Sequence, residues 1–239
     1  MPMAGEGSRF ANAGWTTPKP LILLEGKPLF IRAIDSIAKY LNADIAVKYS
    51  FIVRQEHIDN YEIDKQIKNY LPSANVFAVK NTTRGSVETC LIAESAIDEN
   101  DGIVVMDCDL EFRSDIFINN INVLLSINSP KCGGMLVSFD SNLPKYSYAE
   151  LDKHGFVVRT AEKEPISNHA LCGAYFFTTG KRFVETAKQL LNEPEFKKPE
   201  YYVSLLYNYL IENDEYVLLT HVDEYKSYGT PEELEQYTK

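Results

Sequence analysis

Two basic residues near the start of the chain are spaced to bind an anion. Gly5, Gly7 and Ser8 form a small-residue loop, which leaves backbone N–H groups uncovered. Arg9 follows directly, and Lys19 lies between two prolines that restrict the backbone on either side of it. An arginine grips phosphate oxygens with a planar fork, whereas a lysine acts as a compact charge. The pattern predicts a triphosphate-binding loop, and a flexible chain terminus is the alternative.

Two carboxylates follow an apolar run in the middle of the chain. Asp107 and Asp109 come directly after "GIVVM", residues 102–106, with a cysteine between them. Carboxylates at the end of a strand suit Mg²⁺, a hard ion that bridges protein oxygens and phosphates. The alternative is an acidic turn that caps a helix near Ser114. Because of the loop upstream, we expect a Mg²⁺ site.

A third candidate lies in the segment "AEKEPISNHALCGAYFF", residues 161–177. Glu162 can accept hydrogen bonds from sugar hydroxyls, and Lys163 beside it can hold a sugar phosphate. A charge pair of this kind also occurs simply as a solvated surface cluster.

The segment "NTTRGSVET", residues 81–89, places a glycine at the start of a predicted helix. At Gly85 a nucleobase could approach the backbone closely, because glycine has no side chain. An ordinary N-terminal cap is the alternative reading of the same residues.

Apolar runs alternate with amphipathic stretches over the first half of the chain. This alternation predicts an α/β protein with a mostly parallel sheet that is covered by helices on both faces. In such sheets ligands bind beyond the carboxyl ends of the strands, where the opening loop and Asp109 both fall. The predicted strands are residues 50–53, 75–79 and 102–106, and the predicted helices are residues 30–41, 61–71 and 86–97.

The second half predicts strands at shorter spacing, with a hairpin turn in "LDKHGF", residues 151–156. No internal repeat or low-complexity linker interrupts the chain, so we expect a single domain over residues 1–239. The further predicted strands are 133–139, 146–151, 155–160, 173–178 and 216–220, and the further helices are 181–191, 201–212 and a short one after Pro231.

Composition excludes several classes of function. The formal net charge is −10 and no run of Lys or Arg occurs, which argues against nucleic acid or an anionic membrane as the main partner. No apolar stretch reaches the roughly 18 residues of a membrane span, and no signal peptide is recognised. The four cysteines form no CxxC pair and, with the four histidines, no zinc pattern, so we expect reduced thiols in the cytoplasm.

Taken in order, the motifs resemble the sugar-phosphate nucleotidyltransferase family. The family's GxG(S/T)R…PKP opening is similar to residues 5–9 and 18–20, and its strand-end aspartate to Asp109. Its EK-P-SN-A-G-Y-F stretch is similar to residues 162–176, and its W-x-D-x-GTPE segment to "YKSYGTPEEL", residues 225–234. The resemblance runs from Met3 to Leu234.

The resemblance implies a Rossmann-like α/β fold of the GT-A type and a transfer of NMP from an NTP to a sugar 1-phosphate, with Mg²⁺ as cofactor and pyrophosphate released. It implies Arg9, Lys19 and Asp109 as catalytic residues and Asp109 with Asp107 as metal ligands. It also implies a nucleotide-binding set of Ala4, Gly5, Glu6, Gly7, Ser8, Arg9, Lys19, Thr83, Gly85 and Ser86, and an acceptor-binding set of Tyr146, Ser147, Glu162, Lys163 and Gly173.

Two features depart from the family pattern. Members have an apolar strand before the glycine loop, whereas here only Met1 and Pro2 precede the motif, so we expect the first strand to be missing. The family's late metal-binding aspartate falls at Ser227, which is a poor Mg²⁺ ligand. We therefore expect Asp107, Asp223 or water to complete the metal site.

The opening "PMAGEGSRF" and the "YSY" segment resemble a branch found with capsule and surface-polysaccharide genes. This branch implies an activated sugar for such a polymer as the product. Two other functions stay open: a cytidylyltransferase for a small non-sugar phosphate such as phosphocholine, and a catalytically weak subunit that binds nucleotides.

Overall fold

The computed structural model describes residues 1–127, 129–194 and 196–238. The chain divides into two compact units. Unit 1 comprises Met1–Thr82, Met106–Arg113 and Glu224–Lys239, and unit 2 comprises Thr83–Val105 and Ser114–Asp223. Each unit is described by itself. The expected single domain stays a prediction, because compact units of this kind occur within one domain as well as in two.

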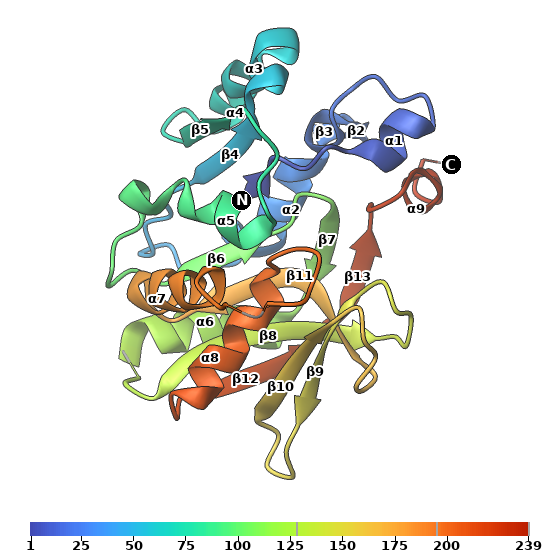
Figure 1. The fold of residues 1–239 in the computed structure, drawn as a ribbon. Coiled ribbons are helices and arrows are strands. Elements are labelled where there is room, and N and C mark those ends of the chain that lie inside the picture. The colour runs from blue at the N-terminus through green and yellow to red at the C-terminus, as the bar shows by residue number, and fades with distance from the viewer. Residues whose placement is uncertain (128, 195, 239) are drawn as a thin grey trace. The chain divides into compact units, whose positions relative to one another are not determined.

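Unit 1 contains a three-stranded parallel sheet in the order β1 (Pro2–Met3), β4 (Ser50–Arg54) and β5 (Asn75–Val79). Figure 1 shows β4 and β5 next to each other in one sheet. The expectation that no strand precedes the opening loop is wrong for Pro2 and Met3. They pair with Ile52 and Val53 of β4, and Met3 is buried in the core of the unit.

Helices of unit 1 begin and end where the sequence gives local signals. Buried apolar residues repeat at helical spacing on α2 (Leu29–Ala38) and on α4 (Ile63–Tyr70), so each helix presents one face to the core. The predicted helix 61–71 is in fact preceded by a separate α3 (Gln55–Tyr61), because Glu62 adopts φ 49° and breaks the run. The remaining helices are α1 (Ser8–Asn12), the 3₁₀ turn Lys19–Leu21 and α9 (Pro231–Glu235).

An antiparallel pair in unit 1, β7 (Leu110–Arg113) with β13 (Glu224–Ser227), joins the middle of the chain to its last segment. Glu111 on β7 accepts hydrogen bonds from Arg32 Nε at 2.7 Å and from Lys226 Nζ at 3.1 Å. These two cations hold the pKa of Glu111 below its ordinary value in spite of its partial burial. A second short pair is β2 (Leu23–Leu24) with β3 (Lys27–Pro28).

Unit 2 is built on a six-stranded mixed sheet (Figure 1). Its strand β8 (Cys132–Asp140) is a continuous run of buried residues over most of its length, which is typical of a strand covered on both faces. The strand order is β10 (Val157–Glu162), β9 (Ser147–Leu151), β11 (His169–Phe177), β8 (Cys132–Asp140) and β12 (Tyr216–His221), with β6 (Ile103–Met106) paired to β11. The predicted α/β class is confirmed. The sheet of unit 2 is mixed rather than mostly parallel, because β10 with β9, β9 with β11 and β11 with β8 pair antiparallel, whereas β8 with β12 pairs parallel.

Helices α7 (Gly180–Leu191) and α8 (Leu206–Glu212) pack against the sheet of unit 2 in one apolar core. Phe183, Ala187 and Leu190 form the buried face of α7, and the Thr179 side chain caps this helix by accepting from Arg182 N at 3.2 Å. The other helical elements of the unit are α5 (Ser86–Leu91), α6 (Asp115–Ile127), and the 3₁₀ turns Glu94–Ala96 and Val203–Leu205.

The predicted hairpin between β9 and β10 is confirmed. Asp152 Oδ1 accepts from the backbone N–H groups of His154 and Phe156, at 2.8 and 2.9 Å, and Gly155 supplies the left-handed conformation of the turn with φ 87°.

Among the described residues, no helix is long and apolar enough to cross a membrane.

Gly85, at the start of α5, is required by a close approach of the backbone. Its φ is 144°, and a Cβ atom added there would lie 2.5 Å from the nitrogen and 2.6 Å from the oxygen of Tyr201. The two segments are joined by hydrogen bonds from Tyr201 N to Arg84 O at 2.9 Å and from Val87 N to Tyr201 O at 3.0 Å. A side chain would therefore displace Tyr201.

We predict that Gly85→Ala destabilises the protein by more than about 1 kcal/mol, because the new Cβ cannot be accommodated. Thermal unfolding should then show a fall in Tm of at least about 2 °C. The control is Gly5→Ala, since an added Cβ at Gly5 meets no atom within 4 Å. Equal Tm values for both variants would contradict the close-approach explanation.

Candidate functional site

The opening loop of unit 1 leads from β1 into the short helix α1. Gly7 has φ 64°, and its carbonyl oxygen accepts from the N–H groups of Phe10 and Ala11 at 3.0 and 3.1 Å. Glu6 Oε1 accepts from Thr82 Oγ1 at 3.0 Å, which ties the loop to the segment after β5. Among the loop residues predicted to bind nucleotide, Ala4 is buried, whereas Gly5, Glu6, Ser8 and Arg9 are exposed.

Lys19 and Asp109 meet although ninety positions separate them. The Lys19 Nζ atom lies 2.6 Å from Asp109 Oδ2, and the two side chains are 25% and 21% exposed. Lys19 is held by the 3₁₀ turn between Pro18 and Pro20, and the Asp109 carbonyl accepts from Tyr228 N at 2.7 Å. The ion pair therefore joins the opening segment to the loop between β6 and β7.

Electrostatics keep both members of this pair charged. Burial alone would lower the pKa of Lys19, but the charge of Asp109, its hydrogen bond and the neighbouring acidic groups together outweigh burial and raise that pKa above its ordinary value. Burial would raise the pKa of Asp109, yet the Lys19 ammonium, aided by Arg9, holds it below its ordinary value. Arg9 is thus within electrostatic reach of Asp109. By contrast, burial raises the pKa of the Cys108 thiol to about 12, so this group stays neutral.

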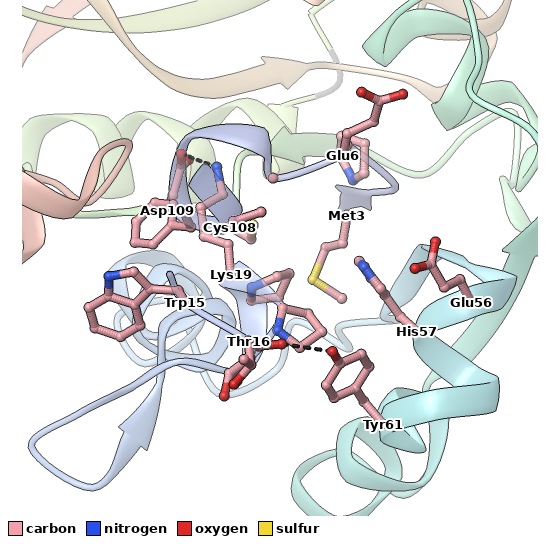
Figure 2. A pocket seen from close by; sticks show the side chains of 18 of the residues that line it. Met3, Glu6, Trp15, Thr16, Lys19, Glu56, His57, Tyr61, Cys108 and Asp109 are labelled. Carbon is pink, nitrogen blue, oxygen red and sulfur yellow. Dashed lines mark hydrogen bonds and ion pairs between the residues drawn. The ribbon is translucent and has the colours of Figure 1, made fainter. Parts of the chain in front are cut away.

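A cavity of about 500 Å³ opens beside the ion pair, within unit 1. This volume lies within the roughly 300–1,000 Å³ of ligand-binding pockets. Figure 2 shows Lys19 and Asp109 on one side of it and His57 with Glu56 on the other. The predicted residues that line it are Gly5, Glu6, Gly7, Lys19, Asp107 and Asp109.

Sequence reasoning missed the wall of the cavity that α3 provides. Glu56, His57 and Tyr61 of α3 line the cavity, and Tyr61 Oη donates to Thr16 O at 2.7 Å. Trp15, after α1, is a further lining residue that the sequence analysis missed. The only sequence signal was the aromatic and histidine content of "QEHIDNY", residues 55–61, directly after a predicted strand.

The side chains around the cavity determine whether a metal ion can bind there. Among the described residues, no group of three or more His, Cys, Asp or Glu side chains could hold a metal ion. Asp107 and Asp109 nevertheless contribute two carboxylates to one cavity. Mg²⁺ usually takes one or two protein carboxylates and completes its shell with water and substrate phosphates. The residues therefore fit a Mg²⁺ ion that is bound together with a triphosphate.

Ser227 is engaged by a residue that the sequence analysis did not consider. Its Oγ donates to Glu233 Oε2 at 2.7 Å, and the N–H of Gly229 donates to the same oxygen at 3.0 Å. Glu233 thus reaches back from the first turn of α9 to the end of β13. An aspartate in place of Ser227 would face this carboxylate, so the serine and Glu233 suit each other in this chain.

Four of the five predicted acceptor-binding residues come together in unit 2. The Ser147 hydroxyl donates to Glu162 Oε2, and the N–H of Lys163 donates to Tyr146 O at 3.0 Å. Lys163 adopts φ 57°, and its Nζ donates to Tyr202 Oη at 2.7 Å. The fifth, Gly173, has φ 91° and lies where the register of β11 shifts against β8.

Glu162 is 7% exposed and receives a second hydrogen bond, from Ser204 Oγ at 2.9 Å. Burial raises the pKa of this carboxyl above its ordinary value, although the hydrogen bonds from Ser147 and Ser204 and the charge of Lys163 oppose the shift. The solvated charge cluster weighed in the sequence analysis is therefore wrong for Glu162, whereas Lys163 is exposed.

The residues predicted to contact a nucleobase are held by local hydrogen bonds of unit 2. Thr83 Oγ1 lies 2.6 Å from Thr89 Oγ1, and Ser86 Oγ donates to Tyr201 O at 3.3 Å. At Gly85, the space that a side chain would take is filled by Tyr201. Packing therefore accounts for this glycine, and contact of these residues with a nucleotide stays a prediction.

Comparisons with known proteins place these features in a family context. A model of the nucleotidyl transferase family matches residues 3–233 of the chain. The chain is also similar to the solved nucleoside-diphosphate-sugar pyrophosphorylase from Vibrio cholerae RC9, with a TM-score of 0.82 and 26% identity over 100% of this chain and 99% of that chain.

A further likeness is to UDP-glucose pyrophosphorylase solved with UDP-glucose, at a TM-score of 0.73 and 17% identity over 99% of this chain and 95% of that chain. At this identity the likeness shows the fold alone. A comparison with curated proteins found no match.

The Lys19–Asp109 pair can be measured by a double-mutant cycle. We predict that Lys19→Met and Asp109→Asn each lower the free energy of unfolding, because each leaves a partly buried partner without its counter-charge. The double variant should lose less unfolding free energy than the two single variants lose together. We expect the difference, which is the coupling energy, to be about 0.5–3 kcal/mol in urea unfolding. Additive losses would mean that the pair contributes nothing to the fold.

The buried carboxyl of Glu162 should make the stability of the protein depend on pH. Because its pKa is raised in the folded protein, the folded state binds more protons, and this group's contribution to stability falls as the pH rises above the ordinary carboxyl pKa. Glu162→Gln keeps an oxygen for Ser147 and Ser204 but removes the charge. We therefore expect the stability of the variant relative to wild type to increase in urea unfolding as the pH rises above 4.5, the ordinary pKa of this carboxyl. Glu164→Gln, which changes an exposed neighbour, should show no such trend.

Proposed function

Because the chain belongs to the nucleotidyl transferase family, we propose that it transfers a nucleotidyl group from a nucleoside triphosphate to a sugar 1-phosphate and releases pyrophosphate. The resemblance to the sugar-phosphate branch is confirmed by the match to the family, and the chain is an enzyme of the nucleotidyltransferase type. The acceptor is our proposal. It is supported by the similarity to the Vibrio cholerae nucleoside-diphosphate-sugar pyrophosphorylase.

One observation carries the donor side of this proposal: Lys19 and Asp109 meet at a cavity whose wall includes the Gly5–Gly7 loop. The loop offers backbone N–H groups near a fixed ammonium group, which is the combination that a triphosphate requires. Arg9 adds a second positive charge within electrostatic reach of Asp109. We propose that Arg9 and Lys19 neutralise the triphosphate and that residues 4–8 wrap it, with Thr83, Gly85 and Ser86 as further nucleotide contacts.

Mg²⁺ is the proposed cofactor, with Asp109 as its main protein ligand and Asp107 as the second. When bound, the ion would neutralise charge on the phosphates and orient them. The lysine that pairs with Asp109 has three N–H donors, so it can hold phosphate oxygens as the carboxylate turns to the metal.

Tyr146, Ser147, Glu162, Lys163 and Gly173 are proposed to bind the acceptor in unit 2. A buried carboxylate is suited to accept hydrogen bonds from hydroxyl groups, because it is shielded from competing water. Two serine hydroxyls already donate to the carboxylate of Glu162, which supports this role. The exposed ammonium of Lys163 is available for the acceptor phosphate.

The proposed reaction is one displacement at phosphorus. An oxygen of the acceptor phosphate forms a bond to the α-phosphorus, the bond from that phosphorus to the bridging oxygen breaks, and pyrophosphate leaves with the electron pair. The chain's residues contribute positioning and charge neutralisation, and no covalent enzyme intermediate is needed.

We further propose that the product is an activated sugar for a surface polysaccharide, on the resemblance of the opening and "YSY" segments to that branch. All four cysteines carry buried thiols, which supports work in the reducing cytoplasm.

The direct test is release of pyrophosphate with a panel of five nucleoside triphosphates and a panel of acceptors that includes hexose 1-phosphates and phosphocholine, with and without Mg²⁺. Turnover with a sugar 1-phosphate supports the proposal. Turnover with phosphocholine alone would establish the non-sugar alternative, and nucleotide binding without turnover would establish the weak subunit.

We predict that Arg9→Ala lowers turnover at least about tenfold, because a charge that stabilises the transferring phosphates is lost. Its Tm should stay within about 1 °C of wild type, since Arg9 is exposed. Arg159→Ala, which removes an exposed arginine of β10, is the matched control and should keep wild-type turnover. Wild-type turnover of Arg9→Ala would remove this residue from the triphosphate site.

A further inference from the structure

His57 is a titratable residue in the cavity wall that the proposed mechanism does not use. It lies on α3, on the side of the cavity opposite Lys19 and Asp109, and Figure 2 shows its imidazole projecting toward Met3 and the interior of the cavity. The edge of its ring packs on Tyr61, with centroids 6.2 Å apart and planes at 84°. Tyr61 in turn donates to Thr16 O, so the position of the histidine is fixed from two sides.

The two ring nitrogens of His57 have different surroundings. Nδ1 is buried, and no described residue provides a hydrogen-bond partner for it. A buried N–H group without an acceptor is costly and rare, whereas a buried lone pair is more easily tolerated. The single proton of the neutral ring therefore belongs on Nε2, the nitrogen farther from the backbone. Burial first, and the charge of Arg54 second, lower the pKa of His57, so the ring is neutral at pH 7.

The charges near His57 do not favour a phosphate on this side of the cavity. Glu56 directly precedes His57 on α3, and Glu56 and Glu6, which both carry carboxylates, line the cavity. Arg54, the nearby cation, is paired with Glu56 at 3.6 Å. The lysine that would hold phosphates lies on the opposite side. An uncharged group that offers an oxygen to a neutral N–H donor fits here better than an anion.

We propose that the His57 side of the cavity receives the nucleoside part of the bound triphosphate, and that the imidazole donates a hydrogen bond from Nε2 to one of its hydroxyl or carbonyl oxygens. The inference rests on the proposed function, because it takes the triphosphate to be held by Lys19. It makes His57 a residue that distinguishes a nucleotide from a bare polyphosphate.

The experiment compares two ligands by calorimetric titration in the presence of Mg²⁺: inorganic triphosphate and the nucleoside triphosphate that wild type binds most tightly. His57→Phe keeps a ring against Tyr61 but removes the donor. It should weaken nucleotide binding about three- to tenfold, as expected for one lost hydrogen bond, and leave inorganic triphosphate binding within twofold. His57→Gln, whose amide N–H reaches as far as Nε2, should restore most of the lost nucleotide affinity.

Asp59→Asn is the matched control on the exposed face of α3 and should bind both ligands as wild type does. Lys19→Ala should weaken both ligands. The 2′-deoxy form of the same nucleotide separates the two oxygen sources. A loss in His57→Phe that is confined to the ribonucleotide assigns the partner to the 2′-hydroxyl, and an equal loss for both forms assigns it to the base or the rest of the sugar.

Three results would overturn the inference. His57→Phe could weaken inorganic triphosphate as much as the nucleotide, it could weaken neither, or wild type could bind the polyphosphate no more weakly than any nucleotide. The first two leave the proposed function standing if wild type still turns over its substrates. A wild-type protein that binds no nucleotide of the panel contradicts the inference and the proposed function together. Thermal unfolding of both His57 variants shows whether they are folded.

Discussion

The geometry of unit 1 depends on the ion pair between Lys19 and Asp109. It holds the opening segment against the loop that follows β6, and the Asp109 carbonyl is fixed in turn by Tyr228 N at the end of β13. Three segments far apart in the sequence thus meet at one residue, Asp109, through its carboxylate and its backbone carbonyl. Because an unpaired, partly buried charge is costly, each partner keeps the other in place, and the cavity beside them retains its shape.

The same pair sets the terms on which charged ligands can bind. A metal ion that takes the Asp109 carboxylate leaves Lys19 without its counter-charge, and a phosphate that takes the Lys19 ammonium leaves Asp109 exposed to repulsion. If both arrive together, each charge of the pair finds a new partner, and the local charge balance is preserved. Under the proposed function, the pair would therefore favour joint binding of a cation and a polyphosphate over binding of either alone.

Sequence patterns predicted those elements whose signal is local. Residues 50–53 lie in β4 as expected, because burial of a parallel strand requires a continuous apolar run. Pro2–Met3 was missed since two residues are too few for any pattern, and the break between α3 and α4 was missed since Glu62 adopts a left-handed conformation without being glycine. In the site, the sequence predicted Lys19 and Asp109 as functional residues. It did not predict that they pair, because the pairing depends on packing between segments that are ninety positions apart.

The properties of His57 and Glu162 that the sequence analysis missed share a physical cause. A glycine loop or a carboxylate at a strand end has a chemical role that its neighbours in the chain largely determine, so a motif can reveal it. The roles of His57 and Glu162 come from burial, which suppresses the charge of the imidazole and disfavours the charge of the carboxylate. Burial is produced by segments distant in the sequence, such as Thr16 held by Tyr61 and the turn that carries Ser204. A property that depends on burial can be recognised only in the folded chain. At such residues this chain can differ in specificity while keeping the family's motifs.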